Sequence, residues 1–237
     1  MDNLTSMSAQ NVDFKVEART GRLLLRRATF TTEMLRETLA ALRQACEQAD
    51  VLLISAAGAD FSLGRDRQEP RSGPPFDAFK LITDVNAALA DFPGVAVSLV
   101  HGRAYGFAVG MVLRTDIAIA ADDARFALDE VKLGIPPMFI MAGILEHLAP
   151  KAASDIIFSS REFGAAEARD MGLVSRVVPS STLNMAGDEL LAQLKERDPA
   201  VLLASKKYLK AIRELPAAAR PSFALVEQTR FAERSKH

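Results

Sequence analysis

The feature that most constrains this chain is the alternation, along its first half, of short apolar runs with amphipathic helical patterns. The runs at Val51–Ser55, Val95–Val100 and Ile117–Ala121 are short and continuous, as in strands that a sheet buries on both faces. Apolar residues recur at helical spacing over residues 31–46 and 76–92. The second half of the chain is mostly helical in pattern. The sequence therefore predicts an α/β core followed by a helical tail.

Local signals mark the two ends of the predicted core. Phe14–Arg27 reads as a hairpin with its turn at Arg19-Thr20-Gly21, and Thr31 or Thr32 is expected to cap the helix that follows. Asp198-Pro199 is the nearest feature to a domain boundary. We therefore divide the chain into a core at residues 1–197 and a C-terminal helical region at residues 198–237.

The composition excludes several classes of protein. Hydrophobic residues make up 49% and charged residues 25%, which leaves enough apolar material for a folded core. The 29 Lys and Arg nearly balance the 30 Asp and Glu, which argues against nucleic acid or an anionic membrane as a partner. Residues 95–113 are the most apolar stretch, but His101 and Arg103 make them a poor membrane span. With Cys46 as the single cysteine, a disulfide framework is excluded and a cytoplasmic protein is expected.

Common catalytic signatures are absent from the sequence. There is no phosphate-binding G-x-x-x-x-G-K-[ST], no G-x-S-x-G and no H-E-x-x-H. The histidines His101, His147 and His237 lack the partners of a metal site or a nucleophilic triad. We therefore expect no metal and no separate cofactor. The glycines at positions 102, 106 and 110 do not form a dinucleotide fingerprint, and alone they indicate only close backbone packing.

Three blocks in fixed order carry a family resemblance. The first is Asp60-Phe61-Ser62-Leu63-Gly64-Arg65-Asp66, directly after an apolar run, and the second is residues 95–137, VAVSLVHGRAYGFAVGMVLRTDIAIAADDARFALDEVKLGIPP. The third runs from Ser159 to Pro179. They resemble the F-[SC]-x-G-x-D, N-G-x-x-x-G-G-G, F-x-x-P-E-x-x-L-G-I-x-P and T-G-R-x-x-x-A-x-E-A motifs of the crotonase superfamily, the enoyl-CoA hydratases and isomerases. The resemblance covers roughly residues 12–215.

The resemblance implies a fold, a ligand and an assembly. The fold is an α/β spiral of ββα turns with a C-terminal helical region used for trimerisation, so a homotrimer or a dimer of trimers is expected. The ligand is an acyl-CoA thioester, with coenzyme A present only as part of the substrate. Backbone N–H groups of Arg65 and Phe107 correspond to the oxyanion hole, which would stabilise an enolate oxygen. Gly64, Asp66, Gly106 and Gly110 correspond to other substrate-binding positions. Phe107 replaces a glycine and is expected to crowd the acyl pocket.

The carboxylates distinguish between the reactions of the family. Hydratases of the family hold one water with two glutamates, and the matching positions here are Gly110 and Glu130. Only Glu130 is retained, with Asp129 in place of the family's proline. A single carboxylate can abstract a proton beside a thioester and return it two carbons away. The resemblance therefore implies Glu130 as the catalytic residue of an isomerase.

Several neighbouring residues leave alternatives open. Arg65 and Arg67 are either solvated loop charges or contacts for CoA phosphates or an acidic acyl group. Arg114 either pairs with Asp116 or reaches towards Glu130 and lowers its pKa. His101 is interpreted as a structural histidine that makes a hydrogen bond. Residues 137–141 fit an apolar acyl tunnel or a core helix equally well.

The function expected from these observations is that of an acyl-CoA enzyme of fatty acid metabolism, an isomerase or lyase that most simply shifts a double bond in an enoyl-CoA. An enoyl-CoA hydratase or an acyl-CoA decarboxylase on the same fold is the first alternative. A non-catalytic acyl-CoA-binding protein, in which Gly110 and Phe107 reflect lost activity, is the second. RNA binding is disfavoured by the balanced charge.

Overall fold

The computed structural model describes residues 10–70 and 72–234 and is built around one six-stranded sheet. The strand order is β1-β2-β3-β4-β6-β9, in which β1 and β2 form an antiparallel hairpin and all the other neighbours are parallel. These strands are β1 Val12–Glu17, β2 Thr20–Leu25, β3 Val51–Ala56, β4 Val95–Val100, β6 Ile117–Ala121 and β9 Arg176–Val178. Every residue of β4 is buried, as its continuous apolar sequence predicts.

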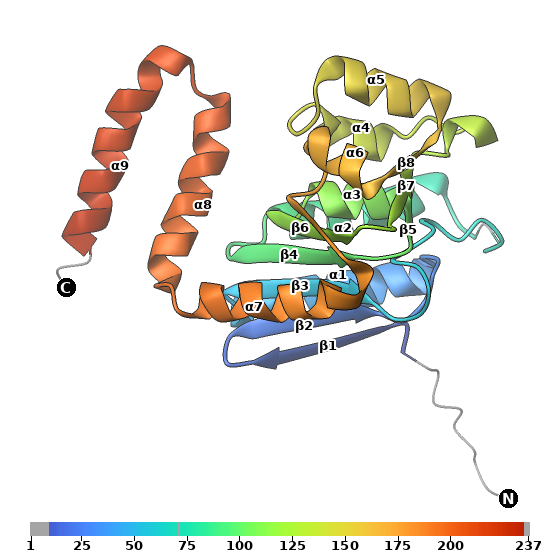
Figure 1. The fold of residues 1–237 in the computed structure, drawn as a ribbon, viewed down its shortest axis with the longest axis horizontal. Helices are drawn as coiled ribbons and strands as arrows, with labels where there is room; N and C mark the ends of the chain where they lie inside the picture. The colour runs from blue at the N-terminus through green and yellow to red at the C-terminus, as the bar shows by residue number, and fades with distance from the viewer. Residues whose placement is uncertain (1–9, 71, 235–237) are drawn as a thin grey trace, which may run out of the picture.

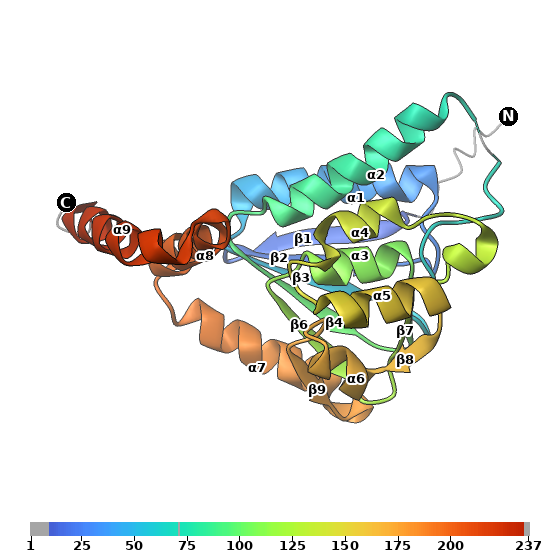
Figure 2. The same ribbon diagram turned by 90° about the horizontal axis from the view of Figure 1, so that it is seen from above.

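Helices cover both faces of this sheet. Figure 2 shows α1 (Thr32–Gln48) and α2 (Pro75–Ala90) on one side and α7 (Leu183–Lys195) on the other. The hydroxyl of Thr31 accepts a hydrogen bond from the amide of Met34 at 3.1 Å, so Thr31 is the N-cap of α1, as predicted. The remaining helices of the core are α3 Phe107–Leu113, α4 Met138–Ile144, α5 Pro150–Ser159 and α6 Ala165–Asp170. None of the described helices is both long and apolar enough to cross a membrane.

A second, smaller sheet lies beside the first and creates the repeating unit of the fold. It consists of β5 Arg103–Tyr105, β7 Arg125–Ala127 and β8 Glu162–Gly164, with β5 parallel to β7. Ser62 adds an isolated parallel bridge to Ala104 of β5. Successive turns of chain therefore place a strand in the large sheet, a short strand in the small sheet and then a helix. The predicted α/β class with a helical C-terminal region is confirmed.

Some local predictions were wrong. The hairpin turn lies at Ala18 and Arg19, both with positive φ (46° and 59°), whereas Gly21 belongs to β2. Close packing favours glycine at position 21, because a Cβ there would lie 3.2 Å from the ring of Phe14. Residues 101–106 contain the short strand β5. Of residues 137–141, which fit a tunnel or a core helix in sequence, residues 138–141 belong to helix α4.

The C-terminal region forms an arm that leaves the core. Figure 1 shows α8 (Pro199–Glu214) and α9 (Arg220–Arg234) projecting from one end of the sheet. Asp198 caps α8 by accepting a hydrogen bond from the amide of Ala200. Neither helix contains a buried residue. Lys206 attaches α8 to the core by donating to the carbonyl of Gly94 and to the carboxylate of Asp116.

Candidate active site

Three loops meet where three short parallel strands end. The loops are residues 63–66 after Ser62, residues 106–107 after β5, and residues 128–130 after β7. The amide of Tyr105 donates to Ser62 O and the amide of Gly106 donates to Ala127 O, both at 2.9 Å, so the strands are in register. Because carboxyl ends of parallel strands lie at one edge, residues far apart in sequence come together here. The predicted site residues Gly64, Arg65, Gly106, Phe107 and Glu130 are all on these loops.

The two candidate oxyanion amides are free to bind a ligand. Phe30 makes backbone hydrogen bonds with both neighbours of Arg65. Its amide donates to the carbonyl of Gly64, and its carbonyl accepts from the amide of Asp66. Alternate amides of an extended segment point to opposite edges, so the amide of Arg65 points away from Phe30. Phe107 is the first residue of α3, where an amide has no partner within the helix. Among the described residues, neither amide donates a hydrogen bond.

Close packing brings these amides together and requires glycine. Gly64 has φ of +81°, and a Cβ there would lie 2.8 Å from the carbonyl oxygen of Tyr105 and 3.3 Å from the amide nitrogen of Phe107. The backbone of the first loop therefore lies directly against the start of α3. A side chain at position 64 would clash with the backbone and separate the two loops.

Glu130 lies over Gly106. The Cβ that a side chain would add at Gly106 falls 2.6 Å from Oε1 of Glu130, and Gly106 itself has φ of +53°. The Glu130 carboxyl is thus placed beside the amide of Phe107, on the next residue. This places the predicted acid/base and the predicted oxyanion donors in one site.

One oxygen of the Glu130 carboxyl, Oε2, is buried without a hydrogen-bond partner among the described residues. Burial raises the pKa of Glu130, its own backbone amide lowers it, Asp129 raises it and Arg67 lowers it. Because desolvation is the largest of these effects, the pKa lies above that of an ordinary glutamate. A raised pKa makes a carboxyl better suited to take up a proton and return it.

Gly110 provides no second carboxylate, and the space beside it is filled. A Cβ on Gly110 would lie 3.3 Å from Ile140 of α4 and 3.4 Å from Nη1 of Arg114. Arg114 donates to the carbonyl of Gly110 at 2.7 Å and to that of Phe139 at 2.8 Å. It therefore joins α3 to α4, and our expectation that it pairs with Asp116 or reaches Glu130 is wrong. Burial lowers the pKa of the Arg114 guanidinium.

The charged side chains of the first loop bind protein groups. Arg65 donates to the carbonyl of Phe30 and pairs with Glu69 at 3.0 Å. Asp66 accepts from the amides of Gln68 and Glu69 and from the hydroxyl of Thr29, which hold its pKa low. These side chains order the loop, so an aspartate here shapes the loop that presents the Arg65 amide.

Arg67 makes a contact that the sequence did not reveal. Its Nη2 lies 2.7 Å from Oδ2 of Asp129, the residue before Glu130. Arg67 had been considered for solvent or CoA phosphates, and no motif links it to residue 129. The one sequence feature that distinguished this position was an aspartate, Asp129, where the family has a proline. His101, in contrast, is placed as predicted, with Nε2 3.0 Å from the carbonyl oxygen of Gly58.

The phenyl ring of Phe107 does not crowd the site. The residue is 5% exposed, and its ring packs edge-on against Phe30, with centroids 5.0 Å apart. Our expectation of a crowded acyl pocket is wrong, because the helix start directs this side chain into the core. The amide stays at the site while the ring supports α3.

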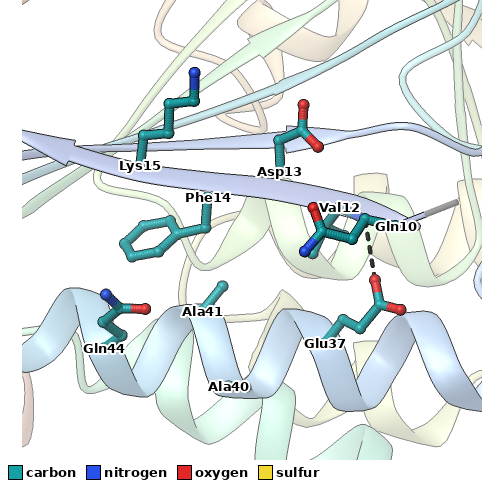
Figure 3. Close-up of a pocket in the computed structure, with 9 residues that line it drawn as sticks. All are labelled: Gln10, Val12, Asp13, Phe14, Lys15, Glu37, Ala40, Ala41 and Gln44. Atoms are coloured by element: carbon teal, nitrogen blue, oxygen red, sulfur yellow. Dashed lines mark hydrogen bonds between the residues drawn. The ribbon is translucent and has the colours of Figure 1, made fainter. Parts of the chain in front are cut away.

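Other parts of the described chain offer less chemistry. An open cleft between β1 and α1 is shown in Figure 3, where the amide of Val12 donates to Glu37 at 3.1 Å. Glu37 also accepts from the backbone and side-chain amides of Asn11, so it joins strand to helix. Within residues 10–70 and 72–234, no three His, Cys, Asp or Glu side chains gather into a possible metal site. His237 lies outside the described residues.

Comparison with solved structures identifies the fold. The chain superposes with a TM-score of 0.87 on a putative enoyl-CoA hydratase from Thermobifida fusca in complex with CoA, at 24% identity over 96% of this chain and 95% of that one. An enoyl-CoA hydratase from Mycobacterium smegmatis gives a TM-score of 0.86 at 23% identity, over 92% and 90% of the two chains. The fold is that of the crotonases, as the resemblance implied.

Sequence comparison identifies the family. A hydroxycinnamoyl-CoA hydratase-lyase from Pseudomonas fluorescens is 30% identical over 70% of this chain. A carnitinyl-CoA dehydratase from Escherichia coli K12 is 33% identical over 71% of it. These alignments span 64% and 66% of the relatives' own lengths, slightly less than two thirds. The family model described as enoyl-CoA hydratase/isomerase matches residues 24–234, and the chain therefore belongs to the enoyl-CoA hydratase/isomerase family of the crotonase superfamily.

Proposed function

We propose that this chain is an acyl-CoA isomerase that moves a double bond in an enoyl-CoA thioester, with Glu130 as its single acid/base. The thioester oxygen would accept hydrogen bonds from the amides of Arg65 and Phe107. Coenzyme A enters as part of the substrate, and no further cofactor is invoked. Two observations support this assignment: Oε1 of Glu130 lies against Gly106, and Oε2 is buried without a hydrogen bond from the described residues.

The reaction follows from the positions of these groups. The Glu130 carboxylate removes a proton from C2 of a 3-enoyl thioester, and the electron pair moves into the thioester carbonyl. The resulting dienolate oxygen is stabilised by the two amides, each of which is worth about 3 kcal/mol of barrier in comparable sites. The protonated Glu130 then returns the proton to C4, which leaves a 2-enoyl thioester. Atoms and charge balance without a second acid.

The observation that carries the proposal is the absence of a carboxylate at position 110. Gly110 faces Ile140 and Arg114, so position 110 supplies no second carboxyl for hydration. One carboxyl suffices for proton transfer within the substrate. It cannot by itself both orient a water and supply the second proton.

The test compares two reactions in the wild type and in Glu130→Gln. Wild type should isomerise 3-enoyl-CoA and hydrate 2-enoyl-CoA poorly. Glu130→Gln should lose isomerisation by about 10²–10⁴-fold, the usual contribution of a positioned acid/base. Thioester binding, measured by calorimetry with free CoA as the control, should remain. Fast hydration, or isomerisation that survives the loss of Glu130, would refute the mechanism.

Hydration or dehydration is the second candidate, and the relatives favour it. The two curated relatives described above are a hydratase-lyase and a dehydratase, by their names. In this case a residue other than one at position 110 would have to hold the water. Hydration that depends on Glu130 would select this candidate over the isomerase.

For the assembly we propose a homotrimer or a dimer of such trimers. The arm formed by α8 and α9 has no buried residues, and its apolar side chains include Val201, Leu203, Leu209, Leu225 and Val226, all exposed. Exposed apolar faces of this extent favour burial against another copy of the chain.

A further inference from the structure

Two parts of the proposed machinery lie on loops that are far apart in sequence and joined by one ion pair. Arg67 follows the amide of Arg65 by two residues, and Asp129 directly precedes Glu130. Nη2 of Arg67 and Oδ2 of Asp129 lie 2.7 Å apart, although the two residues are 62 positions apart. The pair therefore links the loop that bears the first oxyanion amide to the loop that bears the acid/base.

The two members of this ion pair differ in their exposure to solvent. The side chain of Asp129 is 23% exposed and that of Arg67 is 46% exposed. Oδ1 of Asp129 is fully buried and accepts no hydrogen bond from the described residues. Four side-chain polar atoms are buried without a partner in the described part of the chain, and two of them belong to Asp129 and Glu130. A partly buried carboxylate with one cationic partner depends strongly on that partner.

The pair also contributes to the electrostatic environment of Glu130, after the larger effects of burial and of its own backbone amide. The charged side chains that act on the Glu130 carboxyl are Asp129 and Arg67, and they act in opposite directions. An adjacent anion favours the protonated carboxyl and a nearby cation favours the carboxylate. Removing either member therefore changes the proton affinity of Glu130 with a predictable sign.

We propose that Arg67 and Asp129 form a positioning clamp that fixes Glu130 relative to the Arg65 amide and balances the charge at the acid/base. The catalytic part of this inference rests on the proposed function. Neither clamp residue exchanges a proton with the substrate. Both act through Glu130, by its position and by its proton affinity.

The first experiment needs no substrate. The carboxyl of Glu130 is titrated by NMR in protein labelled at glutamate, and its resonance is assigned by its disappearance in Glu130→Gln. Asp129→Asn should lower the titration midpoint of Glu130, and Arg67→Gln should raise it. The conservative variant Arg67→Lys should keep the wild-type midpoint, because it retains the cation.

The chain offers a matched control pair. Arg103 and Asp60 are paired at 2.8 Å with side-chain exposures of 50% and 11%, and they do not act on Glu130. Arg103→Gln should therefore leave the Glu130 midpoint unchanged. Midpoints that do not move in Arg67→Gln and Asp129→Asn, or that move equally in Arg103→Gln, would overturn the clamp.

The second experiment separates the clamp from the proposed reaction. In the isomerase assay Arg67→Gln should lower kcat by about tenfold, a part of the 10²–10⁴-fold that an acid/base supplies. KM should change little, and the pH profile of kcat should move in the direction found by NMR. If no thioester is bound or turned over, the proposed function fails while the NMR result still decides the clamp. If kcat is unchanged with a shifted midpoint, the positioning role is wrong.

Discussion

At the scale of single residues, the site contains a carboxyl whose burial opposes folding. The pKa of Glu130 is raised in the folded protein, so its protonated form is favoured there relative to the unfolded chain. The folded state is therefore stabilised by this group at low pH. That contribution is lost as the pH rises through the folded pKa. In the proposed function, the same raised pKa that disfavours the folded state at high pH allows Glu130 to act as acid and base.

Glu130→Gln should consequently stabilise the fold in a pH-dependent way. At pH 8 the variant avoids an ionised, unpartnered carboxylate, and we expect a gain of about 1 kcal/mol, or roughly 2–4 °C in Tm for a chain of this size. At pH 4 the wild-type carboxyl is protonated and the gain should nearly vanish. Thermal unfolding at both values measures the difference. A larger gain at pH 4 than at pH 8 would have the wrong sign.

Gly106, which precedes α3, and Gly110, in the middle of α3, should respond differently to substitution by alanine. Gly106→Ala forces a Cβ to 2.6 Å from Oε1 of Glu130 at positive φ, and it should cost about 10²-fold in kcat/KM through displacement of the acid/base. Gly110→Ala meets Ile140 and Arg114 at 3.3 and 3.4 Å, so unfolding free energy should change by less than about 1 kcal/mol. Steady-state kinetics and denaturant unfolding of the two variants provide the comparison.

At the residue scale, the sequence predicted where the candidate site residues lie along the chain better than it predicted which groups their side chains contact. Gly64, Gly106 and Glu130 were found because a motif fixes them on loops. The direction of the Phe107 ring and the partners of Arg114 and Arg67 depend on where α3, α4 and the Glu130 loop pack, which no motif encodes. Long charged side chains reach several partners, so sequence alone leaves their contacts open.

At the scale of elements, the long strands and helices were predictable from the sequence, and so was the short strand β7, within the short strand expected at Ala124–Leu128, whereas the other short strands were not. Continuous apolar runs identify β3, β4 and β6, because those strands are buried on both faces. The three-residue strands β5, β8 and β9 carry too few side chains to show a period. These strands form because neighbouring strands lie where they can pair with them. Gly106 directly follows one of these strands, β5.

The junction of α3 and α4 depends on Arg114. Its two hydrogen bonds reach the carbonyls of Gly110 and Phe139, so Arg114→Met leaves two partly buried acceptors without a donor. We expect a loss of about 1–3 kcal/mol in unfolding free energy. Hydrogen exchange should quicken in α4 while β4 stays protected. Equal acceleration in both elements would show that Arg114 supports the fold in general and not this junction.

At the scale of the whole molecule, the helices of the C-terminal arm, α8 and α9, differ from the core because they contain no buried residue. Exposed apolar side chains are not confined to the arm, since Phe76 and Phe158 of the core are also exposed. The family resemblance implied a C-terminal helical region used for trimerisation. Figure 1 shows that the arm projects outward. Three basic side chains attach α8 to the core along its length: Lys206, Lys210 and Arg213. Tyr208 and Phe223 stack at 5.5 Å, so α8 and α9 support each other.

Self-association through this arm leads to a direct test. Leu225 of α9 is 71% exposed and Leu209 of α8 is 58% exposed, so each contributes apolar surface that a single chain leaves in water. Light scattering of the wild type should give a mass of three or six times 25.7 kDa. Leu225→Asp introduces a charge into the contact that would form, and an unpaired buried charge destabilises association strongly. That variant should dissociate at micromolar concentration, whereas Gln228→Asp, on an exposed polar position of the same helix, should not. A wild type that is monomeric at these concentrations would leave the arm's apolar side chains exposed and would contradict the trimer.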